Sequence, residues 1–348
     1  MIALRAVVMA LVLLISAQRS IAQDQKAHLE LTLPTDNDAL FRGDGATFYQ
    51  VIARDFQGVE STPWEGGQYG FVRDPIETSA GIIYKRFHEG IDIRPLYRDA
   101  RGEPLDEVRA IAEGKVVHTN LVSGFSNYGR FIVIEHEWDG ADYYSLYAHL
   151  NSIVVQIGQR VQRGERIGVM GHTGAGLNRE RAHVHVELNL MLSREFESWY
   201  NIYFRNEPNR HGLYNGLNLV GIDIARLYLA LRKQPSLTIP DFLSQETIFY
   251  KVTLPDSRHF DLLKRYPWLL RSPASRDRKS WEISFARSGV PLKIEPSPKA
   301  VSQPELTYFK RNSARYWDLT RETLTGRGEH ASLSSNGRQW MRLLIYPD

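Results

Sequence analysis

Two histidines in an alternating segment are the first residues of this sequence that point to chemistry. From position 182 to 190 the sequence reads AHVHVELNL, with polar and apolar residues in alternation. A period of two is typical of a β-strand with one buried and one open face. We therefore expect the two imidazoles to lie side by side on the open face, which carries all four polar residues: His183, His185, Glu187 and Asn189.

A second set of metal-ligand side chains lies in the segment 87–93. His88 and Asp92 are four residues apart, an even spacing that puts both on one side of an extended chain, and Gly90 between them leaves room for an ion. Imidazole and carboxylate suit Zn²⁺, and a catalytic zinc site has three protein ligands and one position open for water. His88, Asp92 and one histidine of the pair would supply the three ligands.

His149 is predicted to border this metal. It lies in a third alternating segment, 143–150, on the same side as Tyr143 and Tyr147. Zinc lowers the pKa of bound water to about 7. An imidazole that titrates near that pH can take the proton and return it to a leaving amine.

Together the three motifs resemble the lysostaphin-like, LytM-type zinc metallopeptidases, whose signature joins H-x-x-x-D, Y-x-H-L and H-x-H. The likeness extends from about Gly70 to Leu190 and includes shorter motifs such as YGFVRDP at 69–75 and GQRVQRG at 158–164. The resemblance implies a compact antiparallel β domain with a groove over the site, and hydrolysis of peptide cross-links or bridges in bacterial peptidoglycan. It also implies a role for each of five residues: one Zn²⁺ bound by His88, Asp92 and His185, with His149 and His183 flanking the water as catalytic residues.

Two connections depart from the family pattern. The connection 96–107 after the first ligand pair is longer than usual, and 177–181 replaces the usual short turn ahead of H-x-H. We expect both to line the groove and to influence which peptide bond is cut. The sequence leaves open whether that bond is a D-alanyl bond or part of a glycine-rich bridge.

Other polar residues near these motifs have less specific patterns. We expect His136 to be a hydrogen-bonded sheet residue, whereas His172 lies in a loop beside the site where substrate contact stays open. Glu187 fits either a partner of a metal-binding imidazole or a solvent-facing strand acid. Three tyrosines fit either packed or groove-lining positions: Tyr128, Tyr143 and Tyr147.

Two other classes of protein fit parts of the pattern. A non-catalytic LytM-type adaptor activates another wall hydrolase and typically lacks ligands, but all five site residues are present here. A lipoyl- or biotinyl-type carrier uses similar glycine-rich hairpins but needs an acceptor lysine at a hairpin tip. The segment 169–171, Val-Met-Gly, offers none.

The spacing of apolar residues predicts a mainly β chain. Short β-type segments separated by Gly and Asn favour an antiparallel sandwich or open barrel: 82–87, 108–121, 131–138, 143–150, 153–161, 166–170 and 182–190. Beyond Trp199 we expect a smaller α+β domain of unknown role, with helices at 217–233 and 260–270 and strands at 247–254, 281–285 and 341–345. The expected units are a signal peptide at 1–22, an irregular lead-in at 23–80, the peptidase domain at 81–200 and the C-terminal domain at 215–348.

The first residues predict export. A positively charged start, an apolar run at 6–16 that is too short to span a bilayer and Ser20-Ile21-Ala22 fit a secretory signal cleaved after Ala22. The alternative is a retained membrane anchor. We expect the periplasm or cell envelope first and the extracellular medium second, with peptidoglycan stem peptides as the partner and no stable membrane anchor after cleavage.

Composition excludes several classes. The chain has 348 residues, enough for two domains, and no cysteine, which excludes a thiolate zinc site or nucleophile. Loss of Arg5 and Arg19 with the signal segment, which contains no acid, would lower the formal charge from +3 to +1. A nearly neutral chain without clustered Lys and Arg is not expected to bind nucleic acid.

Overall fold

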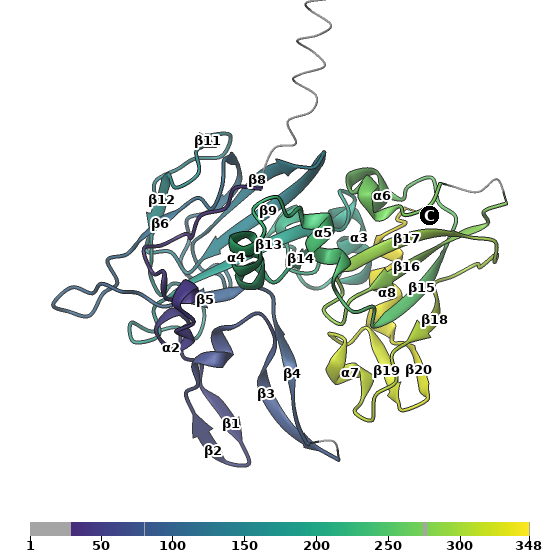
Figure 1. Ribbon diagram of the computed structural model, residues 1–348, viewed down its shortest axis with the longest axis horizontal. Helices are drawn as coiled ribbons and strands as arrows, with labels where there is room; N and C mark the ends of the chain where they lie inside the picture. The colour runs from purple at the N-terminus through teal and green to yellow at the C-terminus, as the bar shows by residue number, and fades with distance from the viewer. Residues whose placement is uncertain (1–28, 80, 274–276, 348) are drawn as a thin grey trace, which may run out of the picture.

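The protein is described by a computed structural model, which covers residues 29–79, 81–273 and 277–347 (Figure 1). The expected signal peptide, 1–22, lies outside these residues. Within the described ranges, no helix combines the length and the apolar character that a membrane span requires.

A seven-stranded antiparallel sheet, here the central sheet, carries the three sequence motifs. Its strands run in the order β11, β7, β8, β9, β13 and β14, and β5 also pairs with β13. Their bounds are β5 (Ile91–Ile93), β7 (Gly114–Asn120), β8 (Phe131–Trp138), β9 (Ala141–Ala148), β11 (Arg160–Val161), β13 (Val184–Met191) and β14 (Leu219–Gly221). A three-stranded sheet shares its core, with strands β6 (Glu107–Arg109), β10 (Ser152–Ile153) and β12 (Arg166–Val169).

Local sequence explains the tight hairpin between β8 and β9. Trp138 pairs with Ala141, so only Asp139 and Gly140 form the loop, and both have positive φ angles, 53° and 69°. Asp-Gly is a favoured pair for a two-residue turn in which both residues have positive φ angles, and the twist of such a turn matches that of the flanking strands. The turn therefore fixes the register of β9, the strand that ends beside the site.

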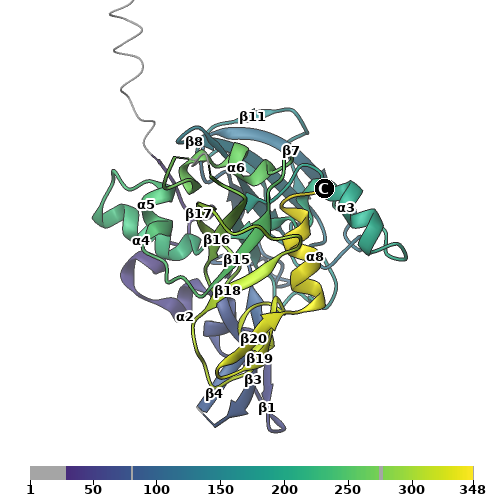
Figure 2. The same ribbon diagram turned by 90° about the vertical axis from the view of Figure 1, so that its right-hand side faces the viewer.

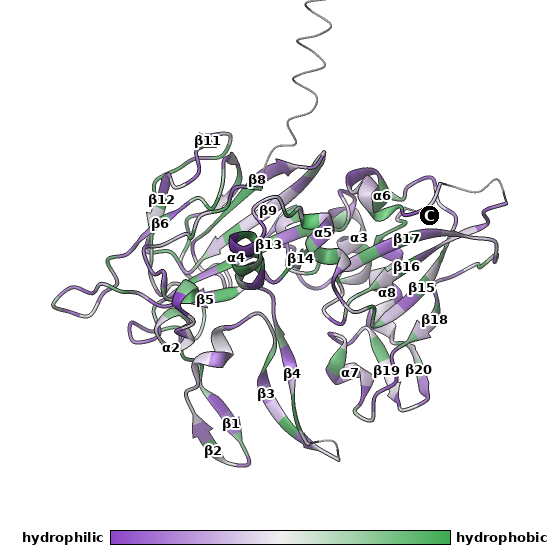
Figure 3. Ribbon diagram, viewed as in Figure 1, coloured by the Kyte–Doolittle hydropathy of each residue, from purple (hydrophilic) through white to green (hydrophobic). Residues whose placement is uncertain are grey.

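Short helices and two hairpins come before the central sheet, within residues 29–79 and 81–88. The helical turns are η1 (Ala39–Arg42), α2 (Gly45–Phe48) and η2 (Trp64–Gly67). The hairpins pair β1 (Arg54–Phe56) with β2 (Val59–Ser61) and β3 (Gly70–Thr78) with β4 (Gly81–His88). Both hairpins project from the body of the molecule (Figure 1), and β1–β2 is mostly hydrophilic (Figure 3).

A second antiparallel sheet dominates the C-terminal part. Its four strands run in the order β17 (Pro291–Ser297), β16 (Ser280–Phe285), β15 (Tyr250–Pro255) and β18 (Glu305–Phe309). The hairpin β19 (Leu324–Arg327) and β20 (His330–Leu333) lies next to it. The helices are α3 (Phe196–Tyr203), η3 (Gly212–Tyr214), α4 (Ile224–Lys233), α5 (Ile239–Ser244), α6 (Asp261–Arg265), η4 (Pro267–Leu269), α7 (Tyr316–Leu319) and α8 (Ser335–Leu343).

Two secondary-structure predictions for this part need correction. The strand predicted at 341–345 is wrong, because 341–343 belong to α8, whose N-cap Ser334 accepts a hydrogen bond from the Gly337 N–H. A short apolar run does not distinguish a strand from a buried helix face. The helix predicted at 217–233 begins only at Ile224, because the Asp223 side chain caps it and the residues before it form β14.

The face of β13 expected to be open is buried. Glu187 and Asn189 are 1% and 0% exposed. A second apolar cluster covers this face, formed by neighbouring strand residues together with the segment after α3: Phe131, Val133, Tyr144, Leu146, Ala148, Met191 and Leu219, with Leu213 and Tyr214 against them. The alternation correctly predicted a strand but did not reveal that both of its faces are covered.

The predicted fold class is confirmed: the chain is mainly β, with open antiparallel sheets and no closed barrel among the described strands, followed by an α+β part. The domain limits stay a prediction. β14 lies beyond the expected end of the peptidase domain at residue 200 and pairs with β13 at Asn189–Met191.

Candidate metal centre

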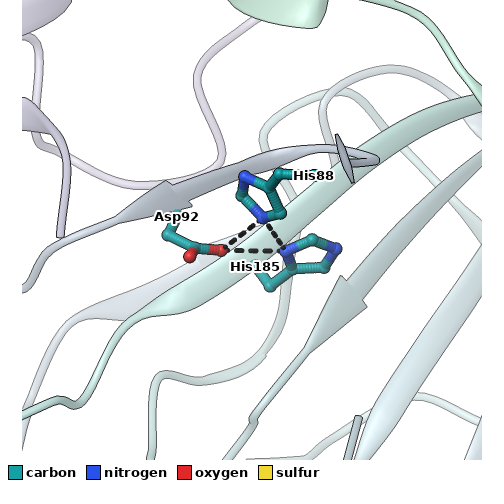
Figure 4. Close-up of side chains that lie close together, drawn as sticks. All are labelled: His88, Asp92 and His185. Atoms are coloured by element: carbon teal, nitrogen blue, oxygen red, sulfur yellow. Dashed lines mark hydrogen bonds and ion pairs between the residues drawn. The ribbon is translucent and has the colours of Figure 1, made fainter. Parts of the chain in front are cut away.

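Strand pairing brings the three predicted metal ligands together. β4 ends at His88, the chain turns at 89–90, and in β5 Asp92 pairs directly with His185 of β13. All three side chains are at most 5% exposed. Figure 4 shows them pointing toward one another from these two adjacent segments.

Two glycines hold the ligand turn against the sheet. A Cβ at Gly90 would lie 2.2 Å from the Val186 carbonyl oxygen, and a Cβ at Gly221 would lie 2.0 Å from the Glu89 carbonyl oxygen. Neither position accepts a larger residue without movement of backbone. Gly90 is therefore required for close packing on β13, which corrects the expectation that it leaves room for an ion.

The ligand atoms are spaced as a single cation requires. His88 Nε2 lies 3.0 Å from His185 Nδ1, and Asp92 Oδ1 lies 3.1 Å from the first and 2.8 Å from the second. A tetrahedral zinc ion with bonds of about 2.0–2.1 Å separates its ligand atoms by about 3.3 Å. The three distances fall within about half an ångström of that value, and a His₂Asp set matches the ligands zinc prefers. The residues therefore fit a zinc ion.

Hydrogen bonds fix which ring nitrogen of each ligand histidine faces the centre. His88 Nδ1 lies 2.7 Å from the Gln68 carbonyl oxygen, which only accepts, so this nitrogen donates and Nε2 keeps its lone pair. His185 Nε2 lies 2.8 Å from Glu187 Oε1, which leaves Nδ1 free in the same way. Tyr128 donates to the same Glu187 oxygen at 2.8 Å. Such outer partners orient metal-binding imidazoles.

Arg73 holds the third ligand. Its Nη2 donates to Asp92 Oδ2 at 2.6 Å, and its Nε donates to the Gly66 carbonyl oxygen at 2.9 Å. An irregularity in the β3–β4 register between Phe71 and Arg73, followed by a positive φ of 53° at Asp74, accompanies this orientation. Because Oδ2 is engaged by the guanidinium, Oδ1 is the oxygen that faces the imidazoles.

Charges at the centre favour a cation among these side chains. Burial would raise the pKa of Asp92, but His88, His183 and Arg73 outweigh it and hold that pKa well below its ordinary value. Burial lowers the pKa of His88. Burial also acts to lower the pKa of His185, but the bonds to Asp92 and Glu187 prevail and raise it to about 10. Without a cation the two carboxylates therefore retain a proton on His185, and a metal ion would replace that proton.

His149 and His183 lie next to the three candidate ligands. Their ring centroids are 4.7 Å apart, and His183 Nε2 lies 3.5 Å from Asp92 Oδ1. Each ring bonds a backbone carbonyl through Nδ1: His149 with Thr173 at 2.9 Å and His183 with Arg181 at 2.7 Å. Both Nε2 atoms are therefore free to exchange a proton. Burial lowers the pKa of both histidines, which favours their neutral forms.

The side assigned to His149 was wrong, although its ring does lie next to His183 and His185. Tyr143 and Tyr147 are fully buried in the main core, on the face opposite His185. β9 ends at Ala148, and His149 has a positive φ of 63°. This left-handed residue turns the side chain away from the alternation and toward the metal ligands, and period-two reasoning has no signal for such a turn.

These five residues line a cleft of about 1090 Å³. Residues of the hairpin β3–β4 line it, and so do residues of α7 and of the segment that follows α7. Figure 1 shows these two parts of the chain near each other. α7 contacts β4, and Arg321 forms an ion pair with Glu89 at 3.0 Å. Trp317 and Arg321 therefore contribute to the cleft, although the sequence of the C-terminal part contains no motif that reveals it.

The two unusual connections behave differently. Leu177 and Arg181 line the cleft as expected, but no residue of 96–107 does, which corrects that expectation. The longer connection, 96–107, instead contacts the loop 177–181. Arg98 donates to the Arg179 carbonyl oxygen at 2.8 Å, and Glu103 accepts from the Arg179 side chain at 2.7 Å.

Three other residues considered in the sequence, His172, His136 and Tyr128, differ in their position relative to the cleft. His172 pairs with Glu103 at 2.9 Å, outside the cleft lining. His136 bonds the Glu113 carbonyl oxygen and the Ser145 hydroxyl, each at 2.7 Å, which confirms it as a hydrogen-bonded sheet residue. Tyr128 lines the cleft.

Comparison with known proteins agrees with this geometry. Residues 86–195 match Peptidase family M23. The Lipoprotein NlpD of Yersinia enterocolitica is 36% identical over 75 residues, which are 22% of this chain and 69% of that protein. The Peptidoglycan DD-endopeptidase ShyA of Vibrio cholerae is 43% identical over 60 residues, 17% of this chain and 13% of the relative.

A further relative carries a different description. The Murein hydrolase activator NlpD of Escherichia coli is 35% identical over 81 residues, 23% of this chain and 20% of the relative. The chain thus spans only a small part of the length of this protein and of the Vibrio cholerae endopeptidase. All five site residues lie inside the matched segment 86–195, and the chain belongs to peptidase family M23.

Proposed function

We propose that the protein is an exported zinc-dependent endopeptidase that hydrolyses peptide cross-links in bacterial peptidoglycan. The observation that carries the proposal is the convergence of His88, Asp92 and His185 on one point in a cleft that His149 and His183 also line. The description of the Vibrio cholerae relative as a peptidoglycan endopeptidase supports the substrate. Peptidoglycan stem peptides would be the partner, and one Zn²⁺ per chain the cofactor.

The ligands and the two flanking histidines have separate tasks in this reaction. When bound by His88, Asp92 and His185, zinc would supply Lewis acidity, which polarises a carbonyl and makes water a stronger acid. His149 and His183 present free Nε2 atoms, so one accepts the proton of the attacking water and delivers it to the leaving amine. The other lies beside the same position and contributes to stabilising the transition state.

Digestion of sacculi tests the proposal. Purified protein should carry about one zinc per chain and should release soluble muropeptides from sacculi of known chemistry. Mass spectrometry of the products identifies the bond that is cut. Protein that holds zinc but leaves purified sacculi intact would contradict the proposal.

A non-catalytic adaptor is the second candidate, and the description of the Escherichia coli relative as a hydrolase activator favours it. An adaptor would release nothing alone but would increase release by an added wall hydrolase, with or without a chelator. The complete set of five site residues supports the enzyme instead. Location in the periplasm or envelope, with the extracellular medium second, rests on the signal-like segment 1–22.

The division of the chain is also a proposal. A peptidase domain at 81–200 agrees with the matched family segment 86–195. The four-stranded sheet β15–β18 supports a C-terminal domain within 215–348, while β14, inside these limits, belongs to the central sheet.

Replacing Arg73 with alanine is expected to weaken zinc affinity by about 10–100-fold, the usual effect of losing an outer partner of a ligand. Loss of the bond to Asp92 frees that carboxylate to rotate, which lowers zinc affinity. Loss of the positive charge of Arg73 acts to raise zinc affinity, because it removes a repulsion of the cation. Competition with a chelating dye measures the affinity, and Arg73→Lys should restore part of it.

Arg86→Ala is the matched control, because Arg86 is the exposed cross-strand neighbour of Arg73 on β4. Its affinity should equal that of the unchanged protein. If Arg73→Ala bound zinc more tightly, repulsion between charges and not orientation of Asp92 would be the main effect of Arg73.

A further inference from the structure

An aromatic hollow opens beside the catalytic cleft. Its volume is about 200 Å³, and it lies where α3, α8 and the residues before β14 meet. Figure 2 shows α8 close to α3, and the two helices are in contact. Drug-sized ligands occupy pockets of roughly 300–1,000 Å³, so this hollow has the size for about one ring.

The hollow and the cleft are continuous. Four residues line both: Gly216, Leu217, Arg321 and Glu322. A ligand that extends from the metal centre along the C-terminal wall of the cleft therefore reaches the hollow without leaving the protein surface. Leu217 is 39% exposed at this junction, so the path between the two sites is partly apolar.

Three aromatic side chains line the hollow: Trp199, Phe204 and Trp340. Trp199 is 2% exposed and donates through Nε1 to the Gln339 carbonyl oxygen at 3.1 Å. Trp340 donates through Nε1 to the Leu217 carbonyl oxygen at 2.9 Å. Because both indole N–H groups are engaged by backbone, the ring faces are held in place before a ligand arrives.

Polar side chains form the rim. Asn336 and Glu322 are exposed and share a hydrogen bond of 3.1 Å, and Gln339 is half-buried beside them. The one cation among the lining residues, Arg321, is neutralised by Glu89. The hollow therefore does not favour a carboxylate ligand. Aromatic faces with amide groups at the edge suit a neutral ring that has an apolar face and polar substituents.

We propose that the hollow binds one N-acetylhexosamine ring of the glycan strand while a stem peptide occupies the cleft. This inference rests on the proposed function, because the peptides of peptidoglycan are attached to such sugars. An extended peptide spans about 3.3–3.6 Å per residue, so a cross-link at the metal centre stays within a few residues of its sugar. The C–H face of the ring would stack on Trp340, and the rim amides would bond its hydroxyl and acetamido groups.

Titration with peptide-free glycan tests the proposal. The probe is the β-1,4-linked tetramer of N-acetylglucosamine, added to the full chain carrying His149→Ala and followed by calorimetry and tryptophan fluorescence. We expect saturable binding with Kd on the order of 1 mM or below, the range for a ligand held through one ring. Absence of saturation at higher concentrations would overturn the proposal.

Rim variants locate the binding site. Asn336→Ala and Gln339→Ala should each weaken binding about fivefold, the effect of one neutral hydrogen bond, and Trp340→Leu should weaken it tenfold or more by removing the aromatic face. Gln234→Ala is the matched control, since Gln234 is an exposed amide outside the hollow. Because the rim side chains are not part of the core, their variants keep the test valid even if Trp340→Leu unfolds.

The outcomes separate this inference from the proposed function. If the rim variants leave glycan binding unchanged, the sugar site is contradicted. It is also contradicted if Asn336 and Gln339 affect only the binding of a stem peptide that carries no sugar. Neither result would contradict hydrolysis. Glycan binding that follows the rim variants, in a protein that does not cut sacculi, would support the sugar site and refute the endopeptidase.

Discussion

Replacing His88 with alanine is expected to lower zinc affinity by more than about 100-fold, beyond the effect of losing an outer partner, and to reduce release of muropeptides to background. His88 supplies one of three converging ligand atoms, and its Nε2 is oriented by the bond from Nδ1 to Gln68. Two remaining ligands do not complete a catalytic site. Metal analysis after dialysis and digestion of sacculi measure the two effects.

His172→Ala is the matched control, because His172 lies near the site but pairs with Glu103 outside the cleft lining. It should retain about one zinc per chain and most of the activity. A His88→Ala protein that still contains the full amount of zinc would show that the ligands have been assigned incorrectly.

Replacing His149 with alanine should reduce hydrolysis by about 10²–10⁴-fold, the range for loss of a positioned acid or base, while the zinc content stays unchanged. His149 Nε2 is free and borders the ligands, but His149 is not one of the three residues whose atoms converge. The comparison of zinc content with muropeptide release therefore separates proton transfer from metal binding.

His136→Ala is not a suitable control for this change, because both of its ring nitrogens hold sheet residues together. His118→Ala is better, since His118 lies outside the cleft lining. If His149→Ala digested sacculi at the full rate, the proton would have to travel through His183 alone, and the mechanism described above would be wrong.

The part of the candidate site that could be predicted from local patterns is the part that lies on or next to regular strands. Strict alternation, a local pattern with a fixed geometry, placed His183 and His185 on one face. His88 and Asp92 do not lie on one extended segment as expected, because the chain turns at 89–90 between β4 and β5, and it is this turn that brings them together. The resemblance to a known family then distinguished His185 from His183, which alternation alone left open.

What the sequence did not predict depends on backbone turns and long-range packing. The orientation of His149 follows from one positive φ angle, and that of Arg73 goes with an irregular β3–β4 register. The burial of Glu187 requires Leu213 and Tyr214, more than twenty residues away in sequence, to cover the sheet. Arg321 reaches the cleft through a contact with Glu89, which lies 232 residues away in sequence. None of these contacts has a local sequence pattern.

The short strand β14 completes the edge of the sheet that the segment 86–195 would leave open on its own. It hydrogen-bonds the last residues of β13, and its Gly221 lies against the backbone of Glu89 between two of the candidate ligands. A polypeptide that stopped at residue 195 would leave backbone N–H and C=O groups of β13 without partners at the sheet edge. Bare edges of this kind recruit other strands, so such a fragment would lose solubility and self-associate through β13, the strand that carries the candidate ligand His185.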